Sequence, residues 1–370
     1  MSTLPEHTQA LVIGAGVIGT SVAFHLAEAG VSTVVLEQAT PGSGASGATA
    51  GVLRTYFPGD AANGRLAVRS MAAYHDFAER TGADVGLRRV GFLVLFTEEH
   101  QVRNFRADQA AQHAAGVDVE LVTAADAVRL NPLLGERDIL AAAWAPEAYV
   151  CDPQAIVRGY AAAAQRAGAV LRTATSVTGI DPDGRVRTPH GSITAGSIVC
   201  AAGPWSQPVA AMAGVDLPVT GHPTELLLTD ELPDRPEIPL TLHAASGLRV
   251  RGWEDRILVG MGRPRPDEPR ESWLQRLSGR LGATYPPLAG IGLRPGWTGA
   301  WDGSPDGTAL IGRAPSRPFL YAAGFSGHGL CQAPVAGEII RDLHSGAPLP
   351  STAADLSLDR LTAAAPSRQP

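Results

Sequence analysis

The sequence contains no lysine, because all 30 of the basic residues among its 370 residues are arginine. Genomic base composition that favours Arg, Ala, Gly and Pro codons accounts for this bias. Its chemical consequence is that no side-chain primary amine is present to act as a base, as a Schiff-base nucleophile or as an ammonium anchor for a carboxylate. A lysine in any of these roles is therefore excluded.

Cysteine and long apolar runs are also scarce, and acidic residues outnumber basic ones. Cys151, Cys200 and Cys331 lie far apart without a CxxC pair, which excludes a disulfide framework and a zinc site. A net charge of −6 gives no electrostatic case for nucleic acid or an anionic membrane. No apolar run reaches the ~20 residues of a membrane span, and the polar segment Met1–Gln9 lacks the pattern of a secretory signal. We expect a soluble, cytoplasmic protein without a metal site.

The chain begins with a strand, a glycine loop and a helix. Residues 10–14 have the continuous apolar character of a buried parallel strand, and 17–29 have helical apolar periodicity up to Gly30. A second strand, 32–37, ends on an acid. This β-α-β unit surrounds the motif Gly14-Ala15-Gly16-Val17-Ile18-Gly19.

Each glycine of this motif has a physical role in dinucleotide binding, and so has the acid after it. Gly14 makes the tight turn, Gly16 allows a pyrophosphate close to the backbone, and Gly19 allows the helix to pack on the sheet. Glu37 follows Gly19 by 18 residues, where its carboxylate can accept hydrogen bonds from ribose hydroxyls. The motif predicts a nucleotide site rather than a structural turn.

A second strand, glycine loop and helix stand near the end of the chain, in Leu320–Leu330 with Gly324, Gly327 and Gly329. Helix N-termini and loop N–H groups bind electron-rich ligands. Two such loops about 300 residues apart predict one long ligand held at both ends, such as FAD. The small-residue segment 42–51 suits close approach to the middle of that cofactor, although a flexible surface loop has the same composition.

The pattern of elements predicts an α/β fold. We expect an FAD-binding Rossmann-like domain of the glutathione-reductase type, interleaved with an antiparallel-sheet α+β substrate domain. The cofactor domain would be discontinuous, and the tail would pack little. The predicted ranges are 1–85, 150–215 and 297–350 for the cofactor domain, 86–149 and 216–296 for the substrate domain, and 351–370 for the tail.

The ordered series of motifs resembles the D-amino-acid-oxidase-type (DAO) superfamily of FAD-dependent oxidoreductases. The branch that contains sarcosine oxidase, glycine oxidase and dimethylglycine dehydrogenase fits best. The resemblance extends from about residue 9 to 345 and is specific for the superfamily, not for a substrate. It rests on GAGVIG (14–19), Glu37, GASGATAG (44–51), CAAGPWS (200–206), PDGTALIG (305–312) and YAAGFSGHGL (321–330).

The resemblance implies that FAD binds in extended form, with its adenosine end at the first loop and its flavin at the second. It places the N1–C2=O edge of the flavin at the start of the last helix, whose N-terminus stabilises negative charge there. The implied cofactor-binding residues are Gly14, Gly16, Val17, Ile18, Gly19, Glu37, Gln38, Ala45, Ser46, Val177, Ala202, Gly203, Trp205, Gly324, Gly327, His328, Gly329 and Leu330.

The residues that tether flavin covalently in some relatives are absent here. Monomeric sarcosine oxidases use a cysteine shortly before the Pro-Asp pair, and that position is Gly299 in this chain. Dimethylglycine dehydrogenases use a histidine in the loop near 45–50, which has none here. We therefore expect non-covalent FAD.

The substrate anchors only partly follow the family. Arg54 matches the arginine that binds the substrate carboxylate in sarcosine oxidases, although a structural role also fits an arginine there. Cys331 replaces the second anchor, a lysine. Trp301 would wall the pocket above the flavin or belong to the core. His328, or Arg263, would supply positive charge near the flavin in place of the missing oxygen-activating lysine, and His328 would alternatively brace its loop.

These residues predict FAD-dependent oxidation of the C–N bond of an amine or N-substituted amino acid. A hydride would move to flavin N5, and the resulting imine would hydrolyse; no carboxylate base is evident. His222 is a weaker candidate for the site. We expect O2 as the acceptor; a dehydrogenase that passes electrons to a carrier protein or quinone, and a non-catalytic FAD-binding subunit, remain alternatives. The substrate and the oligomeric state are left open.

Overall fold

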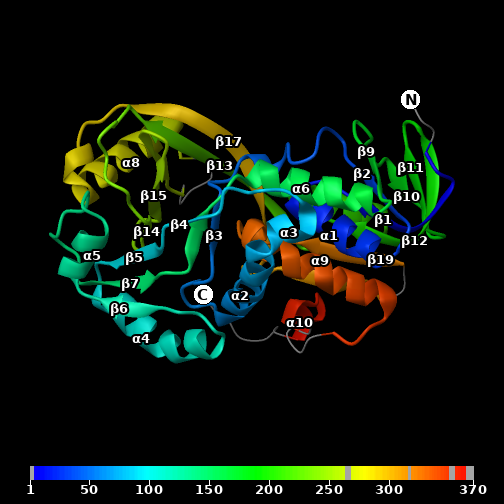
Figure 1. The fold of residues 1–370 in the computed structure, drawn as a ribbon, viewed down its shortest axis with the longest axis horizontal. Helices are drawn as coiled ribbons and strands as arrows, with labels where there is room; N and C mark the ends of the chain where they lie inside the picture. Colours follow the sequence, from blue (N-terminus) through cyan, green and yellow to red (C-terminus); the bar gives the residue numbers. More distant parts are fainter. Residues whose placement is uncertain (1–3, 263–267, 316–317, 350–354, 364–370) are drawn as a thin grey trace.

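The computed structural model describes residues 4–262, 268–315, 318–349 and 355–363. The molecule is elongated, with one large sheet at each end and helices packed along both (Figure 1). Each of these sheets has eight strands, and a third sheet of three strands lies between them. In the described part of the chain, no helix is long and apolar enough to cross a membrane.

The first large sheet is built around β1 and is parallel at its centre. β1 pairs in parallel with β2 on one side and with β12 on the other, and β12 continues to β19. Both faces of β1 are buried from Ala10 to Ile13, which explains the uninterrupted apolar sequence of that part of the strand. The strands are β1 (His7–Ile13), β2 (Thr33–Leu36), β9 (Val170–Arg172), β10 (Gly179–Ile180), β11 (Arg185–Thr188), β12 (Gly191–Cys200), β18 (Leu310–Arg313) and β19 (Phe319–Ala323).

Three helices cover one face of this sheet: α1 (Val17–Glu28), α6 (Pro153–Arg166) and α9 (Gly329–Ser345). α1 and α9 pack together closely, because Gly337 of α9 has no side chain where a Cβ would lie 2.6 Å from the Ser21 Oγ of α1. The Ser21 hydroxyl donates to the Ala333 carbonyl at 2.7 Å. This packing places the N-termini of two helices, and so both glycine loops, beside each other.

The second large sheet separates two apolar layers. One face packs on α8 (Arg270–Thr284) and α5 (Ala124–Leu130), and the other packs in part on α4 (Glu99–Ala114). The strand order is β17-β13-β16-β15-β14-β5-β7-β6. Their bounds are β5 (Phe92–Phe96), β6 (Glu120–Val122), β7 (Ala141–Ala145), β13 (Thr220–Thr229), β14 (Leu240–His243), β15 (Leu248–Trp253), β16 (Arg256–Gly260) and β17 (Leu293–Gly303).

The mixed α/β fold class agrees with the sequence prediction, with one difference in the second sheet. β14 and β5 pair in parallel, whereas an antiparallel sheet was expected. These two strands belong to separate passes of the chain, so no hairpin forces them to run in opposite directions. The other pairs in this sheet are antiparallel.

Shorter elements connect the two large sheets. The third sheet has the order β3-β8-β4, and β3, whose last residue is Arg54, runs between the two large sheets. The sequence analysis did not anticipate the long helix α2. The bounds are β3 (Val52–Arg54), β4 (Arg88–Arg89), β8 (Ala148–Val150), α2 (Ala61–His75), α3 (Phe77–Thr81), α7 (Ser206–Met212), and the short 3₁₀ turns η1 (Ala45–Gly47), η2 (Gly203–Trp205) and η3 (Pro286–Leu288).

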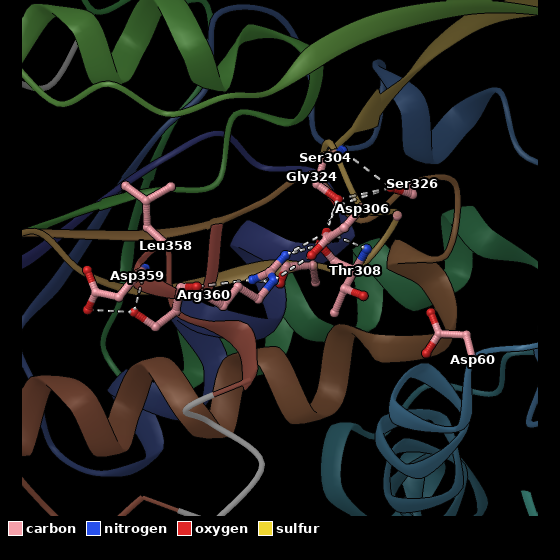
Figure 2. A network of polar contacts seen from close by, with 12 residues as sticks. Asp60, Ser304, Asp306, Thr308, Gly324, Ser326, Leu358, Asp359 and Arg360 are labelled. Atoms are coloured by element: carbon pink, nitrogen blue, oxygen red, sulfur yellow. Dashed lines mark hydrogen bonds and ion pairs between the residues drawn. The ribbon is translucent and has the colours of Figure 1, made fainter. Parts of the chain in front are cut away.

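The tail packs more than the sequence analysis expected, within the part described, 355–363. Leu356 is buried, and the Arg360 guanidinium bonds the Asp306 carboxylate at 2.8 and 2.9 Å (Figure 2). Arg360 also donates to the carbonyls of Thr308 and Ala309. The helix α10 (Asp359–Ala363) is therefore attached to the segment of the Pro-Asp motif. The expectation of a loosely packed tail rested on its amino-acid composition, and composition cannot show that one arginine of the tail pairs with Asp306.

Candidate cofactor and substrate site

The first glycine loop has the backbone geometry that its sequence predicts. Gly14 has a φ of +103°, and a Cβ there would lie 2.5 Å from the Ala201 carbonyl oxygen. A Cβ on Gly19 would lie 1.9 Å from the Gly14 carbonyl oxygen, so Gly19 serves the packing of α1. At the start of α1, the Val17 N–H donates to the Ser46 hydroxyl at 2.9 Å. The loop is thus fixed from two sides.

Glu37 closes the first loop from the end of β2. One carboxylate oxygen accepts the Ala15 N–H and the other accepts the Ala39 N–H, both at 2.8 Å. The side chain is almost fully buried and its neighbour Gln38 lies beside it on the wall of the same cavity. Each carboxylate oxygen keeps a second lone pair, which is available to a hydroxyl donor.

The second glycine loop is held by a buried acid. The Asp302 carboxylate accepts the N–H groups of Gly324 and Phe325 at 2.6 and 3.2 Å, and its carbonyl accepts the Ser326 N–H. Burial raises the pKa of Asp302 to about 6, against the effect of these donors. Figure 2 shows Ser304 and Ser326 side by side next to Gly324. Gly324 has a φ of +69°, so the turn requires a residue without Cβ strain.

Both loops open into one cavity of about 700 Å³. It extends from Glu37 and Gln38 past η1 to the first turn of α9, and the second large sheet closes its other side. Gly19 and Gly324 lie behind the wall. The predicted residues that line it are Gly14, Gly16, Val17, Ile18, Glu37, Gln38, Ala45, Ser46, Arg54, Val177, Ala202, Gly203, Trp205, Trp301, Gly327, His328, Gly329, Leu330 and Cys331.

The shape and donors of this cavity fit a dinucleotide. A Cβ on Gly16 would lie 3.2 Å from the Ser46 hydroxyl, so the glycine keeps the backbone accessible at the N-terminus of α1. The first N–H groups of an α-helix have no partner inside the helix, and they favour anions. Two such helix starts, those of α1 and α9, line the cavity. Trp205 is 46% exposed and borders the middle of the cavity.

Arg54 supplies a cation at the α9 end. Its guanidinium donates to the Tyr56 carbonyl and lies 4.1 Å from the centre of the Phe57 ring and 5.0 Å from that of Phe92. Burial lowers the pKa of Arg54 to about 10, so it remains charged at neutral pH. No described carboxylate forms an ion pair with it. The aromatic rings and one carbonyl fix this cation and leave its charge unbalanced.

His328 does not provide the positive charge that we expected of it. Burial, with the charges of Arg54 and Arg249, lowers its pKa to about 3. The ring contacts Phe57 edge-on at 4.6 Å between centroids. A neutral imidazole at neutral pH therefore packs at the start of α9. The other candidate, Arg263, lies outside the described residues.

Cys331 and Trp301 both reach the cavity. The Cys331 thiol lies 3.5 Å from the Val52 carbonyl oxygen, and burial raises its pKa, so it is neutral. Trp301 lies on β17 opposite His222 of β13, and the two rings stack at 4.4 Å between centroids. Trp301 therefore walls the cavity while it is braced by His222. Gly299 lies on the same strand, and a Cβ there would be 2.2 Å from the Ala48 Cβ.

Two residues of this site, Asp302 and Arg249, were not predicted from the sequence. Asp302 directly follows Trp301 and no motif singled it out. Arg249 stands in the alternating segment Leu248-Arg249-Val250-Arg251, which predicted a strand. An arginine at every second position of an otherwise apolar strand was the available signal, since such a residue faces away from the core.

Comparison with known proteins agrees with this arrangement. The family model of DAO, FAD-dependent oxidoreductase, matches residues 9–343. The mitochondrial dimethylglycine dehydrogenase of Mus musculus is 30% identical over 263 residues, covering 69% of this chain and 30% of that protein. The glycine oxidase of Geobacillus kaustophilus (strain HTA426) is 29% identical over 350 residues, covering 90% of this chain and 91% of that protein.

Among solved structures, the L-proline dehydrogenase from P. horikoshii superposes with a TM-score of 0.89 at 27% identity, covering 97% of this chain and 99% of that one. The chain spans about a third of the length of the mitochondrial dehydrogenases that it matches. Because the family model covers nearly the whole chain, this chain belongs to the DAO family of FAD-dependent oxidoreductases.

Proposed function

We propose that this protein oxidises the C–N bond of an amino acid or N-substituted amino acid, with non-covalent FAD in the cavity and O2 as the electron acceptor. The observation that carries the substrate assignment is Arg54, a half-buried cation without an acidic partner in the described chain, at the α9 end of the cavity. A carboxylate on the substrate would balance that charge.

We further propose which parts of the chain would hold FAD. The first sheet and its helices would form the cofactor domain, and the second large sheet would form the substrate domain. Gly14 to Gly19, Glu37 and Gln38 would hold the adenosine end; Ala45, Ser46, Val177, Ala202, Gly203 and Trp205 would border the middle; Gly324 and Gly327 to Leu330 would hold the flavin. When bound, FAD supplies the group that accepts a hydride from the carbon next to the substrate nitrogen.

The protein would contribute orientation and electrostatics. Arg54 would fix the substrate carboxylate, and its own position is fixed by the Tyr56 carbonyl and the faces of Phe57 and Phe92. These rings also keep water away from the anchor. A positively charged site disfavours a protonated amine, so the substrate nitrogen would bind in its neutral form. Because the His328 ring is neutral, the positive charge of the site would come from arginine alone.

The direct test is to mix purified holoenzyme with N-methylglycine, proline, glycine and other amino acids without oxygen. Loss of the flavin absorbance band identifies a substrate, and peroxide formed on admitting air identifies O2 as the acceptor. A colourless protein that takes up no FAD would contradict the whole proposal. FAD released by acid precipitation would agree with non-covalent binding, whereas flavin that stays with the pellet would contradict it.

Arg54 can be tested by substitution. Removing one partner of a buried carboxylate–guanidinium pair costs about 2–5 kcal/mol, so Arg54→Met should lower kcat/KM by about 30-fold or more. Arg54→Lys should recover part of this loss, since it restores the charge without the bidentate geometry. The matched control is Arg185→Met, at an exposed position on β11 of the first large sheet that does not line the cavity. Equal kinetics for wild type and Arg54→Met would refute the anchor.

One observation favours an electron acceptor other than O2. The chain has no lysine, and His328 is neutral at neutral pH, so two groups that could promote the reaction of reduced flavin with O2 are missing. The alternative is a dehydrogenase. Substrate-reduced enzyme that forms peroxide slowly but reduces a quinone or a redox dye rapidly would favour that alternative over the oxidase.

A further inference from the structure

A second arginine, Arg249, faces the same cavity as Arg54. It lies on β15, where Leu248 and Val250 point into the apolar layer beneath α8. Because side chains alternate along a strand, Arg249 points to the opposite face. That face forms the wall of the cavity, where Arg249 is accessible next to Leu226 and Leu240. The strand therefore presents a cation to the site.

The sheet register makes room for this side chain. Gly260 of β16 pairs with Leu226 on one side and with Arg249 on the other. A Cβ on Gly260 would lie 2.7 Å from the Leu226 Cδ2 and 3.5 Å from the Arg249 Cγ. The glycine thus leaves a shallow space over β16, across which the leucine and the arginine side chains extend. A larger residue there would displace the arginine stem.

No described carboxylate balances Arg249 or Arg54. Glu225 stands between Thr224 and Leu226, which line the cavity, but its carboxylate accepts hydrogen bonds from Arg270. Asp302 lines the cavity, yet its carboxylate accepts two backbone N–H groups of the glycine loop and burial raises its pKa to about 6. Within the described chain, neither Arg54 nor Arg249 has an ion-pair partner.

The two arginines act on the same small region. Both lie close enough to His328 to lower its pKa, in addition to the effect of burial, and Arg249 also lowers the pKa of Arg54. Two like charges near each other, partly removed from water, are unfavourable unless anions accompany them. A single substrate carboxylate would balance one of them and leave the other without a partner.

We infer that Arg249 and Arg54 together select an amino-acid substrate with a second carboxylate, Arg249 binding the additional anion. This inference rests on the proposed function, because Arg54 is taken as the anchor for the first carboxylate. It assigns Arg249 as the residue that distinguishes amino dicarboxylates from simple amino acids. The reacting C–N bond would lie between the two anchored groups or beside them, near the start of α9.

The test compares substrates that share one reacting amine and differ in the second carboxylate. N-methylglycine is paired with N-(carboxymethyl)glycine, and N-methylalanine with N-methylaspartate. Wild-type holoenzyme should have a kcat/KM at least about 10-fold higher for the dicarboxylate of a pair. Arg249→Gln should lower kcat/KM for the dicarboxylate by about 10-fold or more, the effect of one hydrogen-bonded charge, and change the monocarboxylate by less than about threefold. Arg249→Lys should restore part of the loss.

A binding measurement separates this inference from the proposed function. Succinate and butyrate are titrated into the holoenzyme, and binding is followed by the change in the flavin absorbance spectrum. Wild type should bind succinate more tightly than butyrate, and Arg249→Gln should remove the difference even if no amine is oxidised. The exposed Arg185→Gln is the control variant.

Two results would overturn the inference. Equal affinity of wild type for succinate and butyrate would mean that Arg249 does not bind a second anion. An equal loss on both members of each substrate pair in Arg249→Gln, with slower reoxidation by air, would assign Arg249 to the flavin or to O2 instead. Failure of every amine to reduce the flavin, with the succinate preference intact, would instead count against the proposed reaction alone.

Discussion

His25 should make the protein sensitive to acid. Its side chain on α1 is 1% exposed and packs against Phe24 and Tyr160. The Nδ1–H donates to the Ser21 carbonyl at 2.9 Å, while Nε2 has no hydrogen-bond partner in the described chain. Burial lowers its pKa from 6.5 to about 3. A proton on Nε2 would therefore be both charged and unpaired inside an apolar core.

The magnitude follows from proton linkage. Below pH 6.5 the unfolded chain binds a proton at this residue, whereas the folded chain binds it only near pH 3. The unfolded state thus gains stability as pH falls, by about 1.4 kcal/mol for each pH unit in this window. Lowering the pH from about 7 to about 4.5 should remove about 2–3 kcal/mol of the free energy of unfolding through His25 alone.

The assay compares wild type with His25→Leu, which keeps an apolar group of similar size and removes the titration. Urea unfolding followed by circular dichroism at each pH gives the free energies of unfolding. Other titrating groups, including Asp302 and His328, contribute equally to both proteins and cancel in the difference. The difference should shift by about 2–3 kcal/mol between the two pH values in favour of the variant. Parallel curves for the two proteins would refute the reasoning.

Two further predictions concern the α1–α9 contact and the second glycine loop. Gly337→Ala would place a Cβ 2.5 Å from His25 Nδ1 at the α1–α9 contact, so we expect a loss of about 1–3 kcal/mol as a lower Tm of the holoenzyme; Gly279→Ala on α8, with no atom within 4 Å of the added Cβ, should not lower it. Asp302→Ala removes the acceptor for the Gly324 N–H and should weaken FAD binding about 10-fold or more, measured by flavin fluorescence titration. Asp302→Asn, which retains an oxygen, should weaken it less, and equal losses in both variants would contradict the assigned role.

Much of the cofactor site could be predicted because it is local in sequence. A strand, a glycine turn and a helix follow one another within about 20 residues, and only glycine allows the φ of +103° at Gly14. The predicted helix 17–29 corresponds to α1 within one residue at each end. Its end was predictable because Gly30, with a φ of +78°, follows the helix.

The protonation states and roles of the charged side chains in the site were less predictable, because burial and distant contacts decide them. His328 was proposed either as a cation near the flavin or as a brace for its loop, and its surroundings hold it neutral. Asp302 was not identified, because its importance comes from two backbone N–H groups that lie more than 20 residues later in the chain. The tail was expected to pack little, but Arg360 meets Asp306 across 54 residues. Contacts of this kind leave no periodic signal.

The sequence by itself determined that this chain holds a dinucleotide between two glycine loops, because backbone geometry at glycine and the order of strand, loop and helix are local properties. It also determined that every strong side-chain cation is an arginine. Only the tertiary structure decided which arginines matter. Arg54 and Arg249 are 195 residues apart, and they meet at one cavity because the end of β3 and one face of β15 both line it.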